Sequence, residues 1–349
     1  MSDEVFTIDE AGAGITVRLM RTTISLLSIA LAVSACGGVD TSGSVANQAC
    51  APVTAKTPAA AALESKFQGS VFTIVIENKS RAQMFQGAKA PYFQSLAKEY
   101  AVADGYRDAR VHPSLPNYIW MASGQNFGIL DDSGPVSHHI DSTSHLVDQI
   151  EAVGKTWKAY QESMGTPCKV VSDGQYAVKH NPFVYFDDIV GWQGTTPVPT
   201  QRCLDNVVDY AELDKDLASG KVPDYVFITP NMINDMHDGS IEQGDAWLSR
   251  EVPKILASDA WKSGGVLIIT ADEGEGRSLT DWSQEDDPPF VLISPLGKKG
   301  YTSEVPYDTS SYVKTVQAIL GLEPLLCGGT DSGVQTMDDL FETPMPAMR

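Results

Sequence analysis

The sequence predicts an α/β fold with a mostly parallel central sheet. Short, continuous apolar runs rich in β-branched residues occur at residues 70–78, 223–231 and 264–276, which is the pattern of strands buried on both faces. Helix-like segments alternate with these runs, and that alternation favours parallel strand pairing. The chain has 349 residues, of which 42% are hydrophobic and 20% charged, so it can bury a sizeable core.

The N-terminal segment, residues 1–36, is predicted to be a signal peptide. Arg18 and Arg21 lie before or at the start of an apolar run that is too short to span a bilayer and ends in small residues. The sequence "VSAC" ending at Cys36 resembles the lipobox of bacterial lipoproteins, with plain secretion as the alternative. Met20 is the more natural start, because the first residues of the chain are acidic and unlike the start of a signal peptide. We therefore expect an exported lipoprotein, in the periplasm or at the cell surface, anchored to the membrane through Cys36.

Residues 37–69 are small, polar and alanine-rich, as in a flexible tether, which leaves residues 70–349 as the folded domain. Four more cysteines in an exported protein suggest two disulfides. Of the three possible pairings, we prefer Cys168–Cys203 with Cys50–Cys327.

The remaining elements alternate along the chain, except for residues 168–216. That segment is rich in Gly, Pro and aromatic residues, and we interpret it as an irregular insertion over the active face. The expected helices are 90–100, 142–153, 249–262 and 310–322, and the further strands are 101–110, 155–164 and 288–295.

Ser114 lies at a predicted helix start that suits a nucleophile. Pro113 disfavours helical geometry in the residue before it, and Pro116 fits the first helical turn, where a missing N–H costs nothing. Ser114 would then lie at or next to the N-cap, near unpaired N–H groups and the positive end of the helix dipole. That environment favours attack on an anionic ester. Taken alone, the same pattern is also explained by simple helix capping.

Oxygen-bearing pairs end two of the predicted strands. Because ligands bind at the carboxyl ends of parallel strands, and adjacent carboxylates are costly without a cation between them, we expect one divalent ion. An all-oxygen set suits Mg²⁺, Ca²⁺ or Mn²⁺ better than zinc. The alternative is that each pair forms a solvated turn. The predicted metal ligands are Glu77, Asn78, Ser114, Asp272 and Glu273.

Histidines form a second group of candidates, because imidazole can donate to a phosphoryl oxygen or protonate a leaving group. His180 follows Lys179, His237 lies in "NDMHD", and His112 lies two residues before Ser114. A single histidine is more often structural, so the prediction depends on the group.

Polar residues around these histidines extend the candidate site. Asn231, Asp235 and Asp238 flank His237 and could orient it or widen the metal site, with turn formation as the alternative. The predicted catalytic residues are Ser114, His180 and His237, and the predicted substrate-binding residues are Asn78, His112, Asn181 and Asp238.

Several segments, in order, resemble the phosphoesterase family, which contains bacterial and fungal acid phosphatases and phosphatidylcholine-type phospholipases C and belongs to the alkaline-phosphatase-like superfamily. They are "FTIVIENKS", "APYFQSLAKEY", "HPSLPNYIWMASG", "LVDQIEAVGKTWKAYQESM", "KHNPFVYFDDI", "PDYVFITPNMINDMHD" and "LIITADEGEG". The resemblance covers about residues 71–321 and implies a three-layer α/β/α sandwich with the metal at the strand carboxyl ends.

The resemblance also implies roles for individual residues. It matches the pairs Glu77-Asn78 and Asp272-Glu273 to metal ligands, Ser114 to the nucleophile, and His180 and His237 to histidines around the phosphate. The phospholipase branch commonly has threonine at the nucleophile position, so the serine favours the phosphatase branch. Lys79-Ser80-Arg81 departs from the family pattern, which often has a histidine or an aromatic residue there.

The predicted function is metal-dependent hydrolysis of small phosphate esters or phospholipid headgroups through a phosphoserine, as in an acid phosphatase. The net charge of −20 makes a nucleic-acid binder unlikely. The alternatives are a phospholipase C acting on phosphatidylcholine-type lipids and a non-catalytic, phosphate-binding surface lipoprotein. Six aromatic residues could bind a choline headgroup or simply pack the core: Tyr118, Trp120, Phe183, Tyr185, Phe186 and Trp192.

Overall fold

The computed structural model describes residues 67–274, 287–323 and 333–342, all of which belong to one compact unit, Val45–Arg349. The predicted signal peptide with its lipobox, the tether up to residue 66 and the Cys50–Cys327 pairing lie outside the described residues. Within the described ranges, no helix has the length and apolar character needed to cross a bilayer.

Eight of the described strands form one mixed sheet in the order β10-β2-β9-β8-β1-β7-β3-β6, and β4 and β5 form a separate pair. All neighbouring pairs are parallel except the two made by β9, which is antiparallel to both β2 and β8. This arrangement confirms the predicted, mostly parallel sheet. The strands are β1 (Val71–Ile76), β2 (Ala101–Ala103), β3 (Trp157–Gln161), β6 (Val207–Asp209), β7 (Tyr225–Thr229), β8 (Val266–Ala271), β9 (Phe290–Ile293) and β10 (Tyr301–Ser303).

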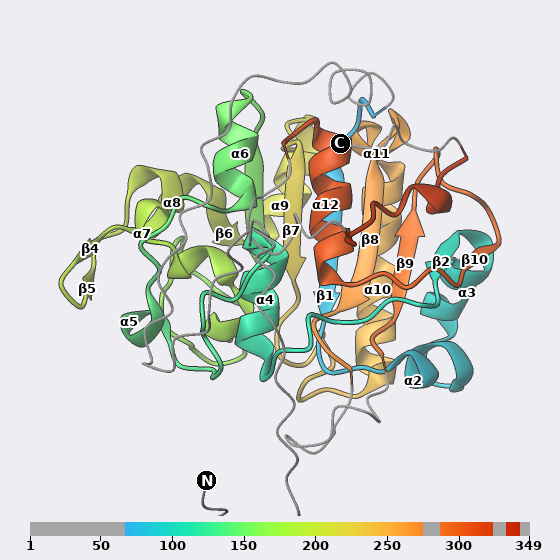
Figure 1. Cartoon of the computed structure of the whole chain (residues 1–349), viewed down its shortest axis with the longest axis horizontal. Coiled ribbons are helices and arrows are strands. Elements are labelled where there is room, and N and C mark those ends of the chain that lie inside the picture. The colour runs from blue at the N-terminus through green and yellow to red at the C-terminus, as the bar shows by residue number, and fades with distance from the viewer. Residues whose placement is uncertain (1–66, 275–286, 324–332, 343–349) are drawn as a thin grey trace, which may run out of the picture. The chain divides into compact units, whose positions relative to one another are not determined.

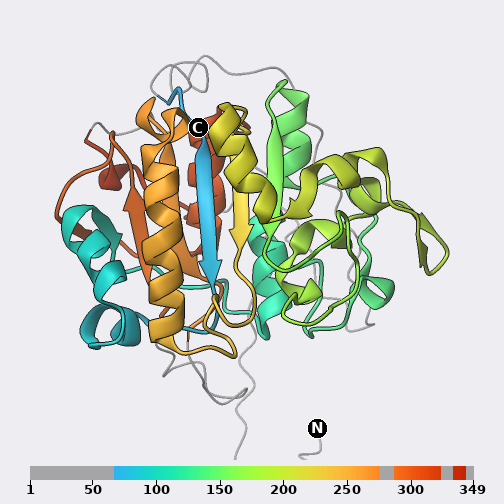
Figure 2. The same ribbon diagram turned by 180° about the vertical axis from the view of Figure 1, so that it is seen from behind.

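Helices cover both faces of this sheet and complete three layers (Figures 1 and 2). Alternate residues of β1 point to opposite faces, as the two-residue period of a strand requires. Val71 and Val75 therefore pack in one core, and Phe72 and Ile74 pack in the other. The first core contains α4 (Ser114–Ser123), α6 (Leu146–Ala152) and α12 (Thr309–Leu320), and the second contains α3 (Pro91–Glu99), α9 (Ala211–Ser219) and α10 (Ile241–Ala257).

Several boundaries differ from the sequence-based expectation. The helix expected at 249–262 starts earlier, because Ser240 and Gln243 form a capping box before α10, and a separate α11 (Asp259–Lys262) begins after Ser258. The strand expected at 101–110 ends after Ala103, where the chain turns. A further capping box starts α2 (Arg81–Gln86), a helix that was not expected.

The predicted insertion, residues 168–216, contains the expected Cys168–Cys203 disulfide, whose Cα atoms lie 5.3 Å apart. Its last part is regular rather than irregular, because β6 pairs in parallel with β3 at the sheet edge and α9 follows it. Its short elements are η1 (Val178–His180), η2 (Pro182–Tyr185), α7 (Asp187–Val190), β4 (Trp192–Gln193), β5 (Thr196–Pro197) and α8 (Gln201–Asn206). The remaining short helices of the described chain are α5 (Pro135–His138) and η4 (Asp338–Leu340).

Candidate active site

The candidate site lies where the three central strands β8, β1 and β7 end. Asp272 follows β8 and Glu77 follows β1. The backbone N–H of Glu77 donates to the carbonyl of Asp235, in the loop after β7, over 2.7 Å. Because these strands are adjacent and parallel, residues far apart in sequence meet at one edge of the sheet.

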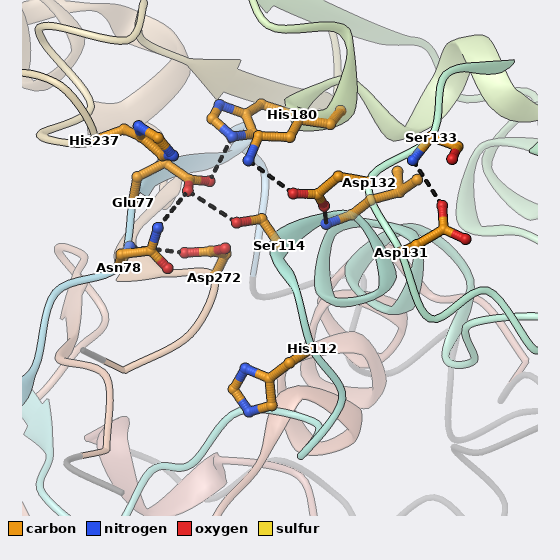
Figure 3. A network of polar contacts seen from close by, with 12 residues as sticks. Glu77, Asn78, His112, Ser114, Asp131, Asp132, Ser133, His180, His237 and Asp272 are labelled. Atoms are coloured by element: carbon orange, nitrogen blue, oxygen red, sulfur yellow. Dashed lines mark hydrogen bonds and ion pairs between the residues drawn. The ribbon is translucent and has the colours of Figure 1, made fainter. Parts of the chain in front are cut away.

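Ser114 reaches this edge from the start of α4. It is the first helical residue, directly after Pro113, and is 1% exposed. Its hydroxyl donates to Glu77 Oε2 over 3.2 Å. Asn78 donates from its side chain to Glu77 Oε2 (3.3 Å) and from its backbone to Asp272 Oδ1 (3.0 Å), so four of the five predicted metal ligands meet (Figure 3).

Glu273, the fifth predicted ligand, makes different contacts. Its Oε2 contacts His112 Nδ1 and accepts a hydrogen bond from Asn117 Nδ2 over 3.2 Å. Asn117 also donates to the carbonyl of Val111 over 2.6 Å. His112 therefore contacts Glu273 and lies apart from the Ser114–Glu77 contact (Figure 3). Asn117, one helical turn after Ser114, could have been identified from the spacing of three residues on a helix.

The pKa values of three buried carboxyl groups of the site are raised. Burial raises the pKa of Glu77, and the charges of Asp272 and Asp235 add to this rise. Burial, followed by the charge of Glu273, likewise raises the pKa of Asp272. Burial also raises the pKa of Asp235, to about 7. Such shifts are typical of carboxylates that share a site without a cation.

The unsatisfied oxygens of this cluster fit a hard divalent cation. Glu77 Oε1, Asp235 Oδ2 and Asp272 Oδ2 are buried and have no hydrogen-bond partner among the residues that the structure describes. Buried polar atoms are normally paired, and carboxylate oxygens are the ligands that Mg²⁺, Ca²⁺ and Mn²⁺ prefer. The donor set is therefore compatible with the expected metal.

His180 links two of these carboxylates. Its Nε2 lies 3.2 Å from Glu77 Oε1 and its Nδ1 lies 3.3 Å from Asp235 Oδ2. The ring stacks on Tyr118 with centroids 5.1 Å apart. Burial, together with the charges of Lys179 and His237, lowers the pKa of His180. A neutral imidazole carries one N–H, so it can donate to only one of the two carboxylates, and the other needs a proton or a cation.

His237 is more accessible than His180. Its side chain is 28% exposed, and its Nδ1 lies 2.8 Å from Asp238 Oδ1. Its ring lies 5.8 Å from that of His180. Asp238, a predicted substrate-binding residue, thus contacts the histidine and can fix its orientation, which leaves Nε2 of His237 available to a ligand.

The remaining candidates are Asn181, predicted to bind substrate, and the six aromatic residues considered for a choline headgroup. Asn181 is fully buried and donates to the hydroxyl of Tyr176 over 2.9 Å. Four of the six aromatic candidates are at most 1% exposed and pack in the core, which favours the packing interpretation over headgroup binding: Tyr118, Phe183, Tyr185 and Phe186. Trp120 donates to Ser310, and Trp192 stacks on His139.

A separate trio, His145, Asp148 and Asp188, also has ligand atoms within 4.8 Å of one another. The guanidinium group of Arg202 already supplies positive charge there, because it contacts both aspartates, each over 2.5 Å. Arg202, on α8, is therefore joined by charge pairing to the two aspartates of the trio, on α6 and α7. We do not count this trio as part of the candidate site.

The comparisons with known proteins agree with this geometry. The model of the Phosphoesterase family matches residues 60–323. A phosphatidylinositol-3-phosphatase of Mycobacterium tuberculosis is 34% identical over 60% of this chain and 64% of its own length. A probable acid phosphatase of Kluyveromyces lactis is 31% identical over 60% of this chain and 49% of its own length. The chain thus spans about half to just under two thirds of these relatives.

More distant similarities point in the same direction. Non-specific phospholipase C6 of Arabidopsis thaliana is 22% identical over 73% of this chain and 52% of its own length. A solved protein of the alkaline phosphatase superfamily from Vibrio parahaemolyticus has a TM-score of 0.53 at 12% identity, over 80% of this chain and 71% of that chain. That likeness establishes the fold, an alkaline-phosphatase-like α/β/α sandwich.

Proposed function

The chain belongs to the Phosphoesterase family, and we propose that it is a metal-dependent acid phosphatase that hydrolyses phosphate esters through a phosphoserine on Ser114. The observation that carries this proposal is the 3.2 Å hydrogen bond from Ser114 to Glu77. It places a hydroxyl beside buried carboxylate oxygens that make no hydrogen bond among the described residues. The names of the relatives support ester hydrolysis at phosphorus.

The side chains of the site suggest how such a reaction would proceed. Glu77, Asn78, Ser114 and Asp272 would hold one divalent cation, whereas Glu273 contacts His112 and Asn117. When bound, that cation would supply positive charge next to the serine and the phosphoryl oxygens. Glu77 already accepts the Ser114 hydrogen bond, so it orients the nucleophile toward phosphorus.

The bonds then change in two steps. Ser114 Oγ passes its proton to Glu77, which accepts its hydrogen bond, and forms a bond to phosphorus. At the same time the bond from phosphorus to the alcohol oxygen breaks, and His237 donates the proton that this oxygen needs. Water next attacks phosphorus and gives a proton to His237, the serine–phosphorus bond breaks, Ser114 Oγ takes its proton back from Glu77, and phosphate leaves. His180, with its ring nitrogens facing Glu77 and Asp235, acts in this scheme by holding both carboxylates in place.

Replacing Ser114 by alanine tests this assignment. Hydrolysis of p-nitrophenyl phosphate should fall by at least about 10³-fold, as expected for loss of a nucleophile, whereas bound divalent metal, measured on the same sample, should be retained in part. Ser123→Ala is the matched control, because Ser123 is a buried serine near the other end of α4. Unchanged turnover in the Ser114 variant would reject the nucleophile.

The phospholipase C alternative is supported by the similarity to the Arabidopsis enzyme, but the burial of most aromatic candidates argues against a choline site of the predicted composition. Release of phosphate from a monoester, compared with release of phosphocholine from lecithin, separates the two activities. A non-catalytic lipoprotein would bind no divalent metal in equilibrium dialysis.

Export with a lipid anchor at Cys36 belongs to the same proposal. The Cys168–Cys203 disulfide supports an oxidising compartment. Mass spectrometry of the mature protein should find a diacylated N-terminal Cys36, and Cys36→Ser should release the protein from membranes. Cleavage before Cys36 without lipid would instead indicate plain secretion.

A further inference from the structure

Asp132 connects the start of α4 to a partly buried lysine. Its Oδ1 accepts the backbone N–H of Leu115, the residue after Ser114, over 3.0 Å, and its Oδ2 accepts from Lys179 Nζ over 2.9 Å (Figure 3). Pro113 offers no side-chain cap, so Asp132 acts as the cap of α4 from a distant position in the chain. One carboxylate thus fixes both the nucleophile's helix and the lysine.

Lys179 lies in the field of the candidate site. Its side chain is only 20% exposed, and it directly precedes His180, which contacts Glu77. Burial alone would lower the pKa of Lys179, but the hydrogen bond to Asp132 raises it. The charges of Glu77 and Asp272 act in the same direction, and the shared carboxylate of Asp132 joins the ammonium group to the start of α4, where Ser114 lies.

The ammonium group also has unused donors. Lys179 Nζ carries three N–H bonds, and Asp132 is its one hydrogen-bond partner within the described ranges. Two of its three donors therefore have no hydrogen-bond partner among the described residues. A lysine side chain held by an ion pair loses little further conformational entropy when it binds an anion, so its charge is preorganised for binding.

We propose that Lys179, held in place by Asp132, binds the phosphoryl group and makes the site selective for phosphate monoesters over diesters. This proposal rests on the proposed function. A monoester is close to doubly negative at pH 7, because its second pKa is about 6, whereas a diester carries one negative charge. The buried carboxylates around Ser114 repel a dianion more strongly than a monoanion, so the dianion depends more on the positive charge of Lys179.

The test compares both ester types at pH 7.5 in the full-length protein and its variants. Lys179→Met should lower kcat/KM for p-nitrophenyl phosphate by about 10²-fold, as for loss of one charge-stabilising donor, and raise the inhibition constant of inorganic phosphate. For bis(p-nitrophenyl) phosphate, the loss in kcat/KM, or in inhibitory affinity if it is not hydrolysed, should be below about 5-fold. Lys179→Arg should restore part of the monoester preference, and Asp132→Asn should mainly raise KM for the monoester.

Lys169→Met is the matched control, because Lys169 is also 20% exposed and paired with an aspartate, Asp173. It should leave both substrates unaffected. Equal losses on monoester and diester, or no loss on either, would overturn the role of Lys179. If Lys179→Met does not fold, the inhibition constant of phosphate in Lys179→Arg and Asp132→Asn decides. A wild-type protein that hydrolyses neither ester would instead reject the proposed function.

Discussion

Ser114 Oγ lies 3.2 Å from Glu77 Oε2, although 37 positions separate the two residues in the chain. One residue starts α4 and the other follows β1, so the contact exists only because the helix begins directly above the carboxyl end of the central strand. Glu77 is fully buried, and burial raises its pKa. The pair thus combines a hydroxyl group with a carboxylate that needs a cation.

Glu77→Gln should weaken metal binding while leaving the metal-free protein at least as stable as the wild type. The amide keeps the shape of the side chain but removes one of several buried charges that repel each other. We expect a loss of about 10²-fold or more in Mn²⁺ affinity. Changing a residue that only hydrogen-bonds to a metal ligand already lowers metal affinity by about 10–100-fold. Calorimetric titration measures the affinity, and thermal unfolding with EDTA measures the stability.

Glu212→Gln, a change at a half-exposed glutamate on α9, is the matched control. It should alter neither the affinity for Mn²⁺ nor the melting temperature with EDTA. Wild-type affinity in the Glu77 variant would mean that the metal, if bound, lies elsewhere. A lower melting temperature of that variant in EDTA would mean that Glu77 stabilises the fold by itself.

The central part of the site could be predicted from sequence because its signals are local. Glu77 and Asp272 each follow a run of six buried strand residues, and the prolines around Ser114 indicate a helix start. The capping box of Ser240 and Gln243 was equally readable, and it would have given the correct start of α10. Each of these features is formed by residues that are close in sequence, so it can be found without a structure.

Other parts of the site depend on tertiary contacts that no local pattern encodes. Asp132 and Lys179 are 47 positions apart, and neither has neighbours that predict their ion pair. β6 is only three residues long and is recognisable as a strand mainly from its pairing with β3. The carboxylate of Glu273 contacts His112 and Asn117. These contacts depend on how α4 packs against the end of β8. Sequence alone could place Glu273 at the strand end but could not assign its partners.

Arg202→Met should destabilise the fold without affecting metal-dependent activity. Arg202 contacts Asp148 and Glu151 on α6 and Asp188 on α7, and its loss would leave the carboxylates of these two helices without their arginine partner. Because the side chain is 20% exposed, we expect a loss of about 1–3 kcal/mol, somewhat below the value for a fully buried pair. Urea unfolding measures the change.

Arg250→Met, at an exposed arginine on α10 whose guanidinium donates to the carbonyl of Ala246 in the same helix, should change the unfolding free energy by less than about 0.5 kcal/mol. The result also tests the alternative role of His145, Asp148 and Asp188 as a metal site. If Arg202→Met leaves the unfolding free energy unchanged while EDTA lowers that of the wild-type protein, the charge-pairing interpretation is wrong.

Asp224→Asn should remove stability that depends on pH. Burial alone would raise the pKa of Asp224, but hydrogen bonds from Thr156 and the charge of Lys155 lower it below its usual value of 3.8. A carboxyl group with a lowered pKa in the folded state stabilises the fold above its unfolded pKa, and this contribution is lost as the pH falls through the lower, folded value. The half-exposed carboxylate joins the start of β3 to β7, so we expect a loss of about 0.5–1 kcal/mol at pH 7.

The measurement is the difference in unfolding free energy between wild type and Asp224→Asn at a series of pH values. The difference should be constant from pH 7 to about pH 5 and should shrink below pH 4, because protonation then removes the charge from the wild type as well. Asp205→Asn, at an exposed position on α8, serves as the control for a lost surface charge. A difference that grows as the pH falls would show that the sign is reversed and that the folded state raises this pKa.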